Sequence, residues 1–345
     1  MAQTIHVSKV SDGFSTVGAA LDSIPADNAT PITIEIAPGI YREKLTVSKP
    51  YVTLSGLGGS SSDTVLTYDD YANARMENGE KYGTFRSYSL LIDTHDVTLQ
   101  NLTVENASGD SKTHGQAIAL YADGDRLVFS NCRLLGHQDT LFTGPLPPVE
   151  IKPGGFAGPK QFAPRINGRH YYKDCYICGD IDFIFGSATA YFENCTIESL
   201  CRTLEDSSAE NIQGYATAAS TPEGQEYGYV FSHCRFTTDC CPDESVYLGR
   251  PWRDYARTVL LSCELGSHIH PAGFHDWNKE KARDTVFYAE YNSLPLDTAD
   301  CPSCEKGLSP FGCRASFCCT LDALQAEHFS KEKVLCGSDG WFPVL

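Results

Sequence analysis

The stretch that decides the fold is Phe192-Glu193-Asn194-Cys195-Thr196-Ile197. Its form is apolar, any, polar, Cys or Leu, any, apolar, and further copies occupy residues 99–104, 129–134, 172–177, 231–236 and 260–265. Cys195 and Ile197 lie two residues apart, which is strand spacing, whereas Phe192 and Cys195 lie three apart. The alternation therefore slips by one at the polar residue, which predicts a strand, a sharp bend and a second strand.

The spacing of the copies indicates how these units are assembled. They begin 20 to 43 residues apart, as the starts at 129, 172 and 192 show. Coils that carry inserted loops of different length have this rhythm, so we predict an all-β solenoid. A β-sandwich is the alternative, but its hairpin turns would not reproduce one bend so regularly.

The repeat also changes the interpretation of the 15 cysteines. Five of them occupy the same inward position of successive copies, where Cys packs as a small hydrophobe. We expect a row of reduced core thiols made of Cys132, Cys175, Cys195, Cys234 and Cys263.

The remaining segments suggest one domain over residues 1–345, with short terminal helices and long inserted loops. Apolar residues at helical spacing in 15–24, stopped by Pro25, predict a helix that closes one end of the solenoid. Residues 321–329 predict another short helix. The insertions are a Pro/Gly-rich one at 143–169 and a Cys-rich one at 294–320. In the second, zinc binding, disulfides and free thiols remain alternatives for the cysteines Cys301, Cys304, Cys313, Cys318 and Cys319.

Composition excludes some classes of partner and favours one cellular compartment. No apolar run reaches 18 residues, so we expect no membrane span. The net charge of −17 argues against a nucleic-acid partner and disfavours dense polyanions as tight ligands. The odd cysteine count and the absence of a visible signal peptide favour a cytoplasmic protein over a secreted one whose signal has been removed.

Two aspartates stand out as candidate catalytic groups. Asp139 lies in Gly-His-Gln-Asp-Thr-Leu-Phe at 136–142, and Asp182 lies in Asp-Phe-Ile-Phe-Gly at 182–186. Each is an acid among apolar residues, where burying a carboxylate costs free energy unless it is paired or hydrogen-bonded. Two such acids with different neighbours predict one ionised and one protonated carboxyl group.

Other residues could complete a site. In Leu-Gly-Arg-Pro-Trp at 248–252, Arg250 can hold a carboxylate with two hydrogen bonds, and Trp252 offers a flat face to a sugar ring. Gln116 and Gln138 could donate hydrogen bonds to an oxyanion without carrying charge. Each of these residues could instead have a purely structural role.

The motifs at 136–142, 182–186 and 248–252 together resemble the three signature blocks of the pectin methylesterases. Further blocks at 36–45 and 116–120 are similar to this family in the same order. The resemblance implies a right-handed parallel β-helix and hydrolysis of the C6 methyl esters of pectin, with release of methanol. The sequence departs from the family pattern in the length of the 143–169 insertion.

The resemblance also implies roles for individual residues. Asp182 would be the nucleophile, and Asp139 the acid that protonates methanol and then the base that activates water. Gln116 and Gln138 would stabilise the oxyanion, and Arg250 would keep Asp182 ionised. A carboxylate nucleophile needs a low pKa and a cationic partner, whereas the acid needs a raised pKa. Four aromatic residues would line the sugar subsites, namely Trp252, Phe183, Phe142 and Trp277.

The resemblance implies no metal and no cofactor, and it implies pectin or methylated oligogalacturonides as partners of a monomeric enzyme. Two alternatives remain open from the sequence. One is a β-helix pectin lyase or glycosidase, and the other is a carbohydrate-binding solenoid without catalytic activity.

Overall fold

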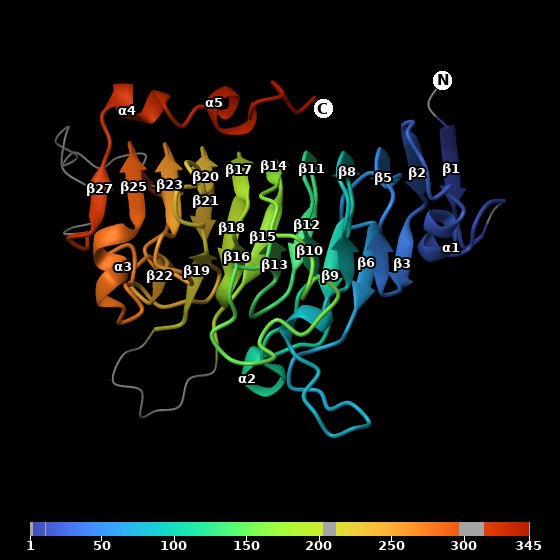
Figure 1. The fold of residues 1–345 in the computed structure, drawn as a ribbon, viewed down its shortest axis with the longest axis horizontal. Coiled ribbons are helices and arrows are strands. Elements are labelled where there is room, and N and C mark those ends of the chain that lie inside the picture. Colours follow the sequence, from blue (N-terminus) through green and yellow to red (C-terminus); the bar gives the residue numbers. More distant parts are fainter. Residues whose placement is uncertain (1–2, 11, 203–211, 297–313, 345) are drawn as a thin grey trace.

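A computed structural model describes residues 3–10, 12–202, 212–296 and 314–344. Its strands form three long sheets of parallel strands that run side by side along one axis (Figure 1). Successive turns of the chain add one strand to each sheet, so most strands pair with their counterparts one coil earlier and one coil later. The fold is a right-handed parallel β-helix, as the sequence predicts.

The three sheets are named A, B and C in the order in which a coil visits them. Within the described residues, sheet A has eleven strands: β1 (Gln3–Val7), β2 (Ile32–Ile36), β5 (Val52–Gly56), β8 (Val97–Gln100), β11 (Leu127–Ser130), β14 (Arg169–Lys173), β17 (Thr189–Glu193), β20 (Tyr229–Ser232), β23 (Arg257–Leu261), β25 (Phe287–Tyr291) and β27 (Cys318–Thr320). Sheet B, in the same part of the chain, has nine: β3 (Gly39–Arg42), β6 (Thr64–Tyr68), β9 (Thr103–Asn106), β12 (Arg133–Leu135), β15 (Tyr176–Gly179), β18 (Thr196–Ser199), β21 (Arg235–Thr237), β24 (Glu264–Leu265) and β26 (Leu294–Pro295). Sheet C, again counting described residues, has seven: β4 (Leu45–Val47), β7 (Leu90–Ile92), β10 (Leu120–Ala122), β13 (Leu141–Thr143), β16 (Ile181–Gly186), β19 (Gly214–Ala219) and β22 (Val246–Gly249).

The sharp bend in the repeat lies between sheets A and B. Strand β17 ends at Glu193, β18 begins at Thr196, and Asn194 between them has a φ of 53°. The equivalent polar residues of the other copies share this left-handed conformation: Asn101, Asn131, Asp174, His233 and Ser262. Asn, Asp and His adopt this region more readily than most residues, which is why polar side chains mark the bend.

The interior is built from stacked rows of side chains. Phe129, Tyr172, Phe192 and Phe231 stack face to face, with 4.5 Å between the ring centroids of each neighbouring pair. The row of core thiols is confirmed, because its five cysteines are free and at most 2% exposed. Equivalent positions stack because parallel strands in register place them one strand spacing apart.

Short helices lie at the N-terminal end, along sheet A and among the loops (Figure 1). In the described residues their bounds are α1 (Val17–Asp22), α2 (Ser111–His114), α3 (Glu280–Thr285), α4 (Ala323–Glu327) and α5 (Lys331–Leu335), and the 3₁₀ turn η1 spans Thr84–Arg86. Helix α1 buries Val17, Ala20 and Leu21 in the main core at the N-terminal end, as expected. Helices α4 and α5 pack against outward-facing residues of sheet A, and α4 confirms the helix predicted within 321–329.

The Cys-rich insertion is only partly described. Cys318 and Cys319 belong to β27, so the end of this segment is the last strand of sheet A. Cys301, Cys304 and Cys313 lie outside the described residues, and the alternatives for them stay predictions. In the part of the chain that is described, none of the helices combines the length and hydrophobicity required to span a lipid bilayer.

The bend generates a testable prediction at Asn194, whose side chain is exposed. Replacing Asn194 with Val should destabilise the protein by about 1–2 kcal/mol, because a β-branched residue is strained in the left-handed region. Asn194→Gly, the matched control, should change the free energy of unfolding by less than about 0.5 kcal/mol, since Gly adopts this conformation without strain. Urea unfolding monitored by circular dichroism measures both, and equal stability of the two variants would contradict the role of the bend.

Candidate active site

Sheet C carries the residues that the sequence singles out. Gln116 and Gln138 precede β10 and β13, Asp139 follows Gln138, Asp182 lies in β16, and Arg250 follows β22. All five line one groove with a volume of ≈ 550 Å³. Figure 1 shows α2 and the long loops projecting from the side of the molecule opposite α4 and α5. Residues up to 134 positions apart in the sequence, from Gln116 to Arg250, thus meet because neighbouring strands lie about 4.8 Å apart.

Both acids occupy an unusual backbone conformation. Asp139 has a φ of 67° and Asp182 a φ of 51°. At Asp182 the register between β16 and β19 also shifts, between Ile181 and Ile184. Such a bulge re-aims side chains locally, and backbone strain of this kind clusters at functional sites. The bulge places Asp182 in the groove and the next residue, Phe183, in the core.

Arg250 holds Asp182 through a bidentate ion pair. Its Nε donates to Asp182 Oδ1 over 2.8 Å, and a terminal nitrogen donates to Oδ2 over 2.7 Å. The guanidinium carbon lies 3.9 Å from the ring centroid of Tyr215 and 3.7 Å from that of Trp277. Two aromatic faces and two hydrogen bonds fix the position of the cation, so the carboxylate is oriented as well as paired.

Burial and nearby charges raise the pKa values of the two acids to different extents. Burial raises the pKa of Asp139 well above its usual range, the Asp182 carboxylate raises it further, and Arg250 opposes both effects. Burial also raises the pKa of Asp182, with Arg250 again opposing. The low pKa expected for Asp182 is therefore not found, because burial outweighs the ion pair. Asp139, which has no such direct cation, is still the more strongly raised of the two.

The two glutamines lie just before strands β10 and β13 of sheet C. Their main-chain carbonyls are used, since Gln116 O accepts from Ala72 N over 2.8 Å and Gln138 O accepts from Ala117 N over 3.0 Å. Their side chains line the groove beside the two acids. Uncharged amide donors in this position can bind a developing negative charge on a substrate oxygen.

The aromatic predictions divide into two groups. Trp252 and Trp277 line the groove, and their contact with sugar rings stays a prediction. Phe183 and Phe142 are wrong as substrate contacts, because both are fully buried. Phe183 points into the main core, and Phe142 packs beneath Trp252 with 6.4 Å between the ring centroids.

Several groove residues were missed from the sequence. Phe85 comes from η1, and Ile151, Lys152 and Phe156 come from the Pro/Gly-rich insertion. Lys279, two residues after Trp277, also lines the groove. The one available signal was the position of the insertion between the two acid motifs, which places its ends next to the site.

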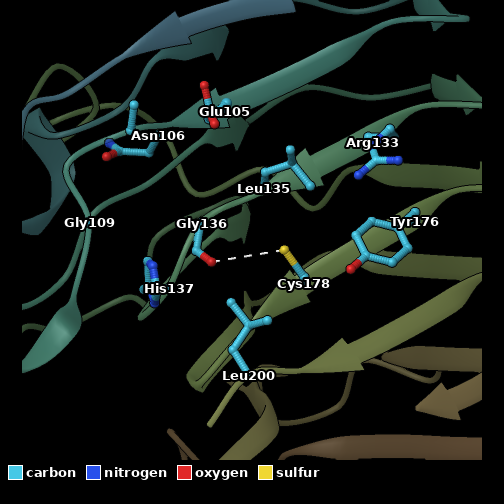
Figure 2. A pocket seen from close by; sticks show the side chains of 11 residues that line it. Glu105, Asn106, Gly109, Arg133, Leu135, Gly136, His137, Tyr176, Cys178 and Leu200 are labelled. Atoms are coloured by element: carbon cyan, nitrogen blue, oxygen red, sulfur yellow. Dashed lines mark hydrogen bonds between the residues drawn. The ribbon is translucent and has the colours of Figure 1, made fainter. Parts of the chain in front are cut away.

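A second pocket, of ≈ 430 Å³, lies behind the turn that carries the Asp139 motif (Figure 2). His137 faces this pocket, with Nδ1 3.4 Å from an oxygen of the buried Asp180. Asp180 also accepts hydrogen bonds from Ser111 Oγ (2.7 Å) and from its neighbouring main-chain N–H. The Cys178 thiol donates a hydrogen bond to Gly136 O. Burial raises the pKa of this thiol to about 11, so Cys178 is unreactive. These contacts support the turn from behind.

Comparison with known proteins places the chain among relatives of known chemistry. The family model described as Pectinesterase matches residues 4–145 and 165–299, which leaves residues 146–164 between the two matched parts. Pectinesterase QRT1 of Arabidopsis thaliana is 34% identical over 298 residues, which cover 84% of this chain and 69% of that protein. Pectinesterase 31 of the same plant is 35% identical over 300 residues, covering 84% and 82%.

Solved structures agree with this assignment. The pectin methylesterase PemA from Erwinia chrysanthemi superimposes with a TM-score of 0.75 at 30% identity, covering 100% of this chain and 99% of that chain. A crystal structure of pectin methylesterase in complex with a hexasaccharide has the same TM-score, identity and coverage.

The expectation of a cytoplasmic protein is wrong. The plant pectinesterases among its relatives are secreted enzymes of the cell wall. The odd number of cysteines is no evidence for a cytoplasmic protein, because buried thiols such as those of the core row can stay unpaired in any compartment.

The family model covers well over half of the chain, and relatives above 30% identity align with most of it. The matched residues include the strands of sheet C and the three motifs that supply Asp139, Asp182 and Arg250 to the groove. The chain belongs to the pectinesterase family, the carboxylic ester hydrolases that remove methyl esters from pectin.

Proposed function

We propose that Asp182 is the nucleophile with which this enzyme attacks the C6 methyl ester of a galacturonate unit in pectin. The observation that carries the proposal is the bidentate ion pair with Arg250, which orients one carboxylate in the groove and opposes its protonation. Attack of an Asp182 oxygen on the ester carbonyl gives a tetrahedral intermediate, and its collapse leaves an acyl-enzyme anhydride.

Asp139 is the proton donor and acceptor in this scheme. Its raised pKa favours the protonated form, which delivers a proton to the departing methoxide and so releases methanol. The carboxylate that results then takes a proton from water as the water attacks the acyl-enzyme. Collapse of the second tetrahedral intermediate frees the galacturonate carboxyl group and Asp182, and the proton remains on Asp139.

Gln116 and Gln138 support both intermediates. Each intermediate carries a negative charge on the former carbonyl oxygen, and amide N–H groups fixed beside the acids can stabilise it. Removing one such donor in other enzymes costs about 10²–10³-fold in kcat. The position of both side chains in the groove supports this role.

The substrate class follows from the family and the groove. A related pectin methylesterase binds a hexasaccharide, so we infer that methylated oligogalacturonides and pectin occupy this groove. Trp252 and Trp277 present aromatic faces to the sugar rings. Both acids, both glutamines and Arg250 come from one chain, so we propose that the enzyme acts as a monomer.

The reaction class is tested with methylated homogalacturonan as substrate. We expect methanol to accumulate without new reducing ends and without unsaturated products. New reducing ends would indicate a glycosidase, and an unsaturated product absorbing in the ultraviolet would indicate a lyase. Either of these without methanol would overturn the esterase assignment.

Replacing Asp182 with Asn should lower kcat for methanol release by about 10⁴-fold or more, since an amide is not a nucleophile. Asp180→Asn is the matched control, because Asp180 is also buried but faces Ser111 and His137 instead of the groove. It should lower kcat less than about tenfold, because the amide oxygen can still accept from Ile181 N–H and the amide nitrogen can donate to the Ser111 hydroxyl. Substantial activity in a folded Asp182→Asn variant would refute the nucleophile assignment.

The raised pKa of Asp139 predicts a stability cost that depends on pH. The folded protein holds this proton more tightly than the unfolded chain, so stability falls as pH rises above the unfolded pKa of about 3.9. Asp139→Asn removes the cost and should therefore raise the melting temperature at pH 7. The gain should shrink as the pH falls to about 4 and disappear below it, where the wild-type carboxyl becomes protonated in both states. Thermal melts across this range check the prediction, and a gain that is independent of pH would argue against it.

A further inference from the structure

Two exposed thiols meet where neighbouring coils leave sheet B. Strand β18 pairs with β21 so that Glu198 lies opposite Thr237. Cys201 and Cys240 each follow three residues later, so they occupy equivalent positions of the two coils. The main-chain N–H of Cys201 donates to Cys240 Sγ over 3.1 Å. Both cysteines are exposed, unlike the five thiols of the core row, so reagents in solution can reach them.

The spacing of the two backbones suits a disulfide. Neighbouring parallel strands lie about 4.8 Å apart, and the Cα atoms of a disulfide usually lie about 4.4–6.8 Å apart. The two thiols also contact each other, since a hydrogen bond with the Cys240 thiol is the largest of the effects that raise the pKa of Cys201. Forming a bond between them therefore requires little movement of the backbone.

Hydrogen bonds hold the turn that carries Cys240. Thr238 Oγ1 accepts from the main-chain N–H groups of Cys240 over 3.2 Å and Cys241 over 2.9 Å. The same hydroxyl donates to Ser199 O over 2.7 Å. Ser199 is the last residue of β18, so the turn is tied to the coil that carries Cys201.

The chain on either side of Cys201 is held as well. Leu200 N–H donates to Gly179 O over 2.8 Å. Arg202 N–H donates to Gln213 Oε1 over 2.7 Å. Because the segments that carry the two thiols are already ordered, closing a bond between them costs little further conformational entropy.

A third thiol, that of Cys241, is the competing partner. It donates to Ser199 O over 3.5 Å, and burial raises its pKa to about 12. The thiolate is the reactive form of cysteine, so this thiol reacts slowly near neutral pH. Among these three cysteines, the contacts thus favour pairing of Cys201 with Cys240.

We propose that Cys201 and Cys240 are oxidised to a disulfide that ties two consecutive coils of the solenoid together. The thiolate of one cysteine attacks a disulfide oxidant such as oxidised glutathione and displaces one of its two thiolates. The second cysteine then attacks the mixed disulfide, so two electrons and two protons pass to the oxidant, which becomes two thiols. Secreted proteins encounter such oxidants, and the plant relatives of this chain are secreted.

The bond restrains the segments that lead from sheet B to two strands of the active site. Cys201 precedes β19, whose Tyr215 ring faces the guanidinium of Arg250, and Cys240 precedes β22, which ends just before Arg250. Strand β22 is the terminal strand of sheet C in the described residues. A cross-link that closes a loop of about 40 residues stabilises the folded state by restricting the unfolded chain, and here it does so beside the strand that delivers the cation.

The test treats the folded protein with oxidised glutathione, alkylates the remaining thiols and maps the disulfides by mass spectrometry of peptides. We expect a pair of peptides joined through Cys201 and Cys240, with two hydrogens lost. The pair should be absent from Cys201→Ser and present in Cys241→Ser, the matched control. Alkylated Cys201 and Cys240, glutathione retained on either sulfur, or a bond from Cys201 to Cys241 would each overturn the proposal.

Melting temperature measures what the bond contributes. The oxidised wild type should melt about 5 °C above the reduced wild type, as followed by circular dichroism. The double variant Cys201→Ser/Cys240→Ser should lose most of this difference, whereas Cys241→Ser should keep it. If the double variant retained the full difference between oxidised and reduced protein, the stabilising role of this disulfide would be refuted.

Discussion

Everything in this molecule depends on the constraint that successive coils stay in register. Parallel strands in sheets A, B and C pair with the equivalent strand one coil on, and in each copy of the repeat one left-handed residue turns the chain between A and B. If the bend moved by one position, every inward side chain of that coil would point outward. The aromatic stack and the row of thiols are consequences of this register, and so is the active site.

The site uses the register to bring groups together and then departs from it locally. Asp182 stands at a bulge in β16, and Asp139 has a positive φ just before β13. Both carboxyls are buried, which costs stability, and Arg250 opposes the cost at both but forms hydrogen bonds with Asp182 alone. Asymmetry between two like groups is what acid–base and nucleophilic chemistry requires, and a single guanidinium held between Tyr215 and Trp277 creates it.

The sequence predicts the regular part of the structure well. Copies of one hexapeptide reveal the solenoid, because a repeated bend imposes the same pattern on each coil. The motifs around Asp139, Asp182 and Arg250 predict one groove, which the structure confirms. The failures come from local backbone geometry and from loops. Phe183 was expected beside the substrate, but at the bulge in β16 it lies in the core. The position of the Pro/Gly-rich insertion between the two acid motifs indicated that it lies near the site, but the residues that face the groove could not be predicted, since Phe156 is placed by tertiary contacts with Phe85 and Trp252.

The row of thiols provides a way to follow the unfolding of this protein. Cys132, Cys175, Cys195, Cys234 and Cys263 stand one per coil along the axis, and none is more than 2% exposed. An alkylating reagent can reach each sulfur only when its own coil opens. The order in which these five positions become labelled in mild denaturant would therefore record where the solenoid starts to unwind and in which direction the unwinding spreads.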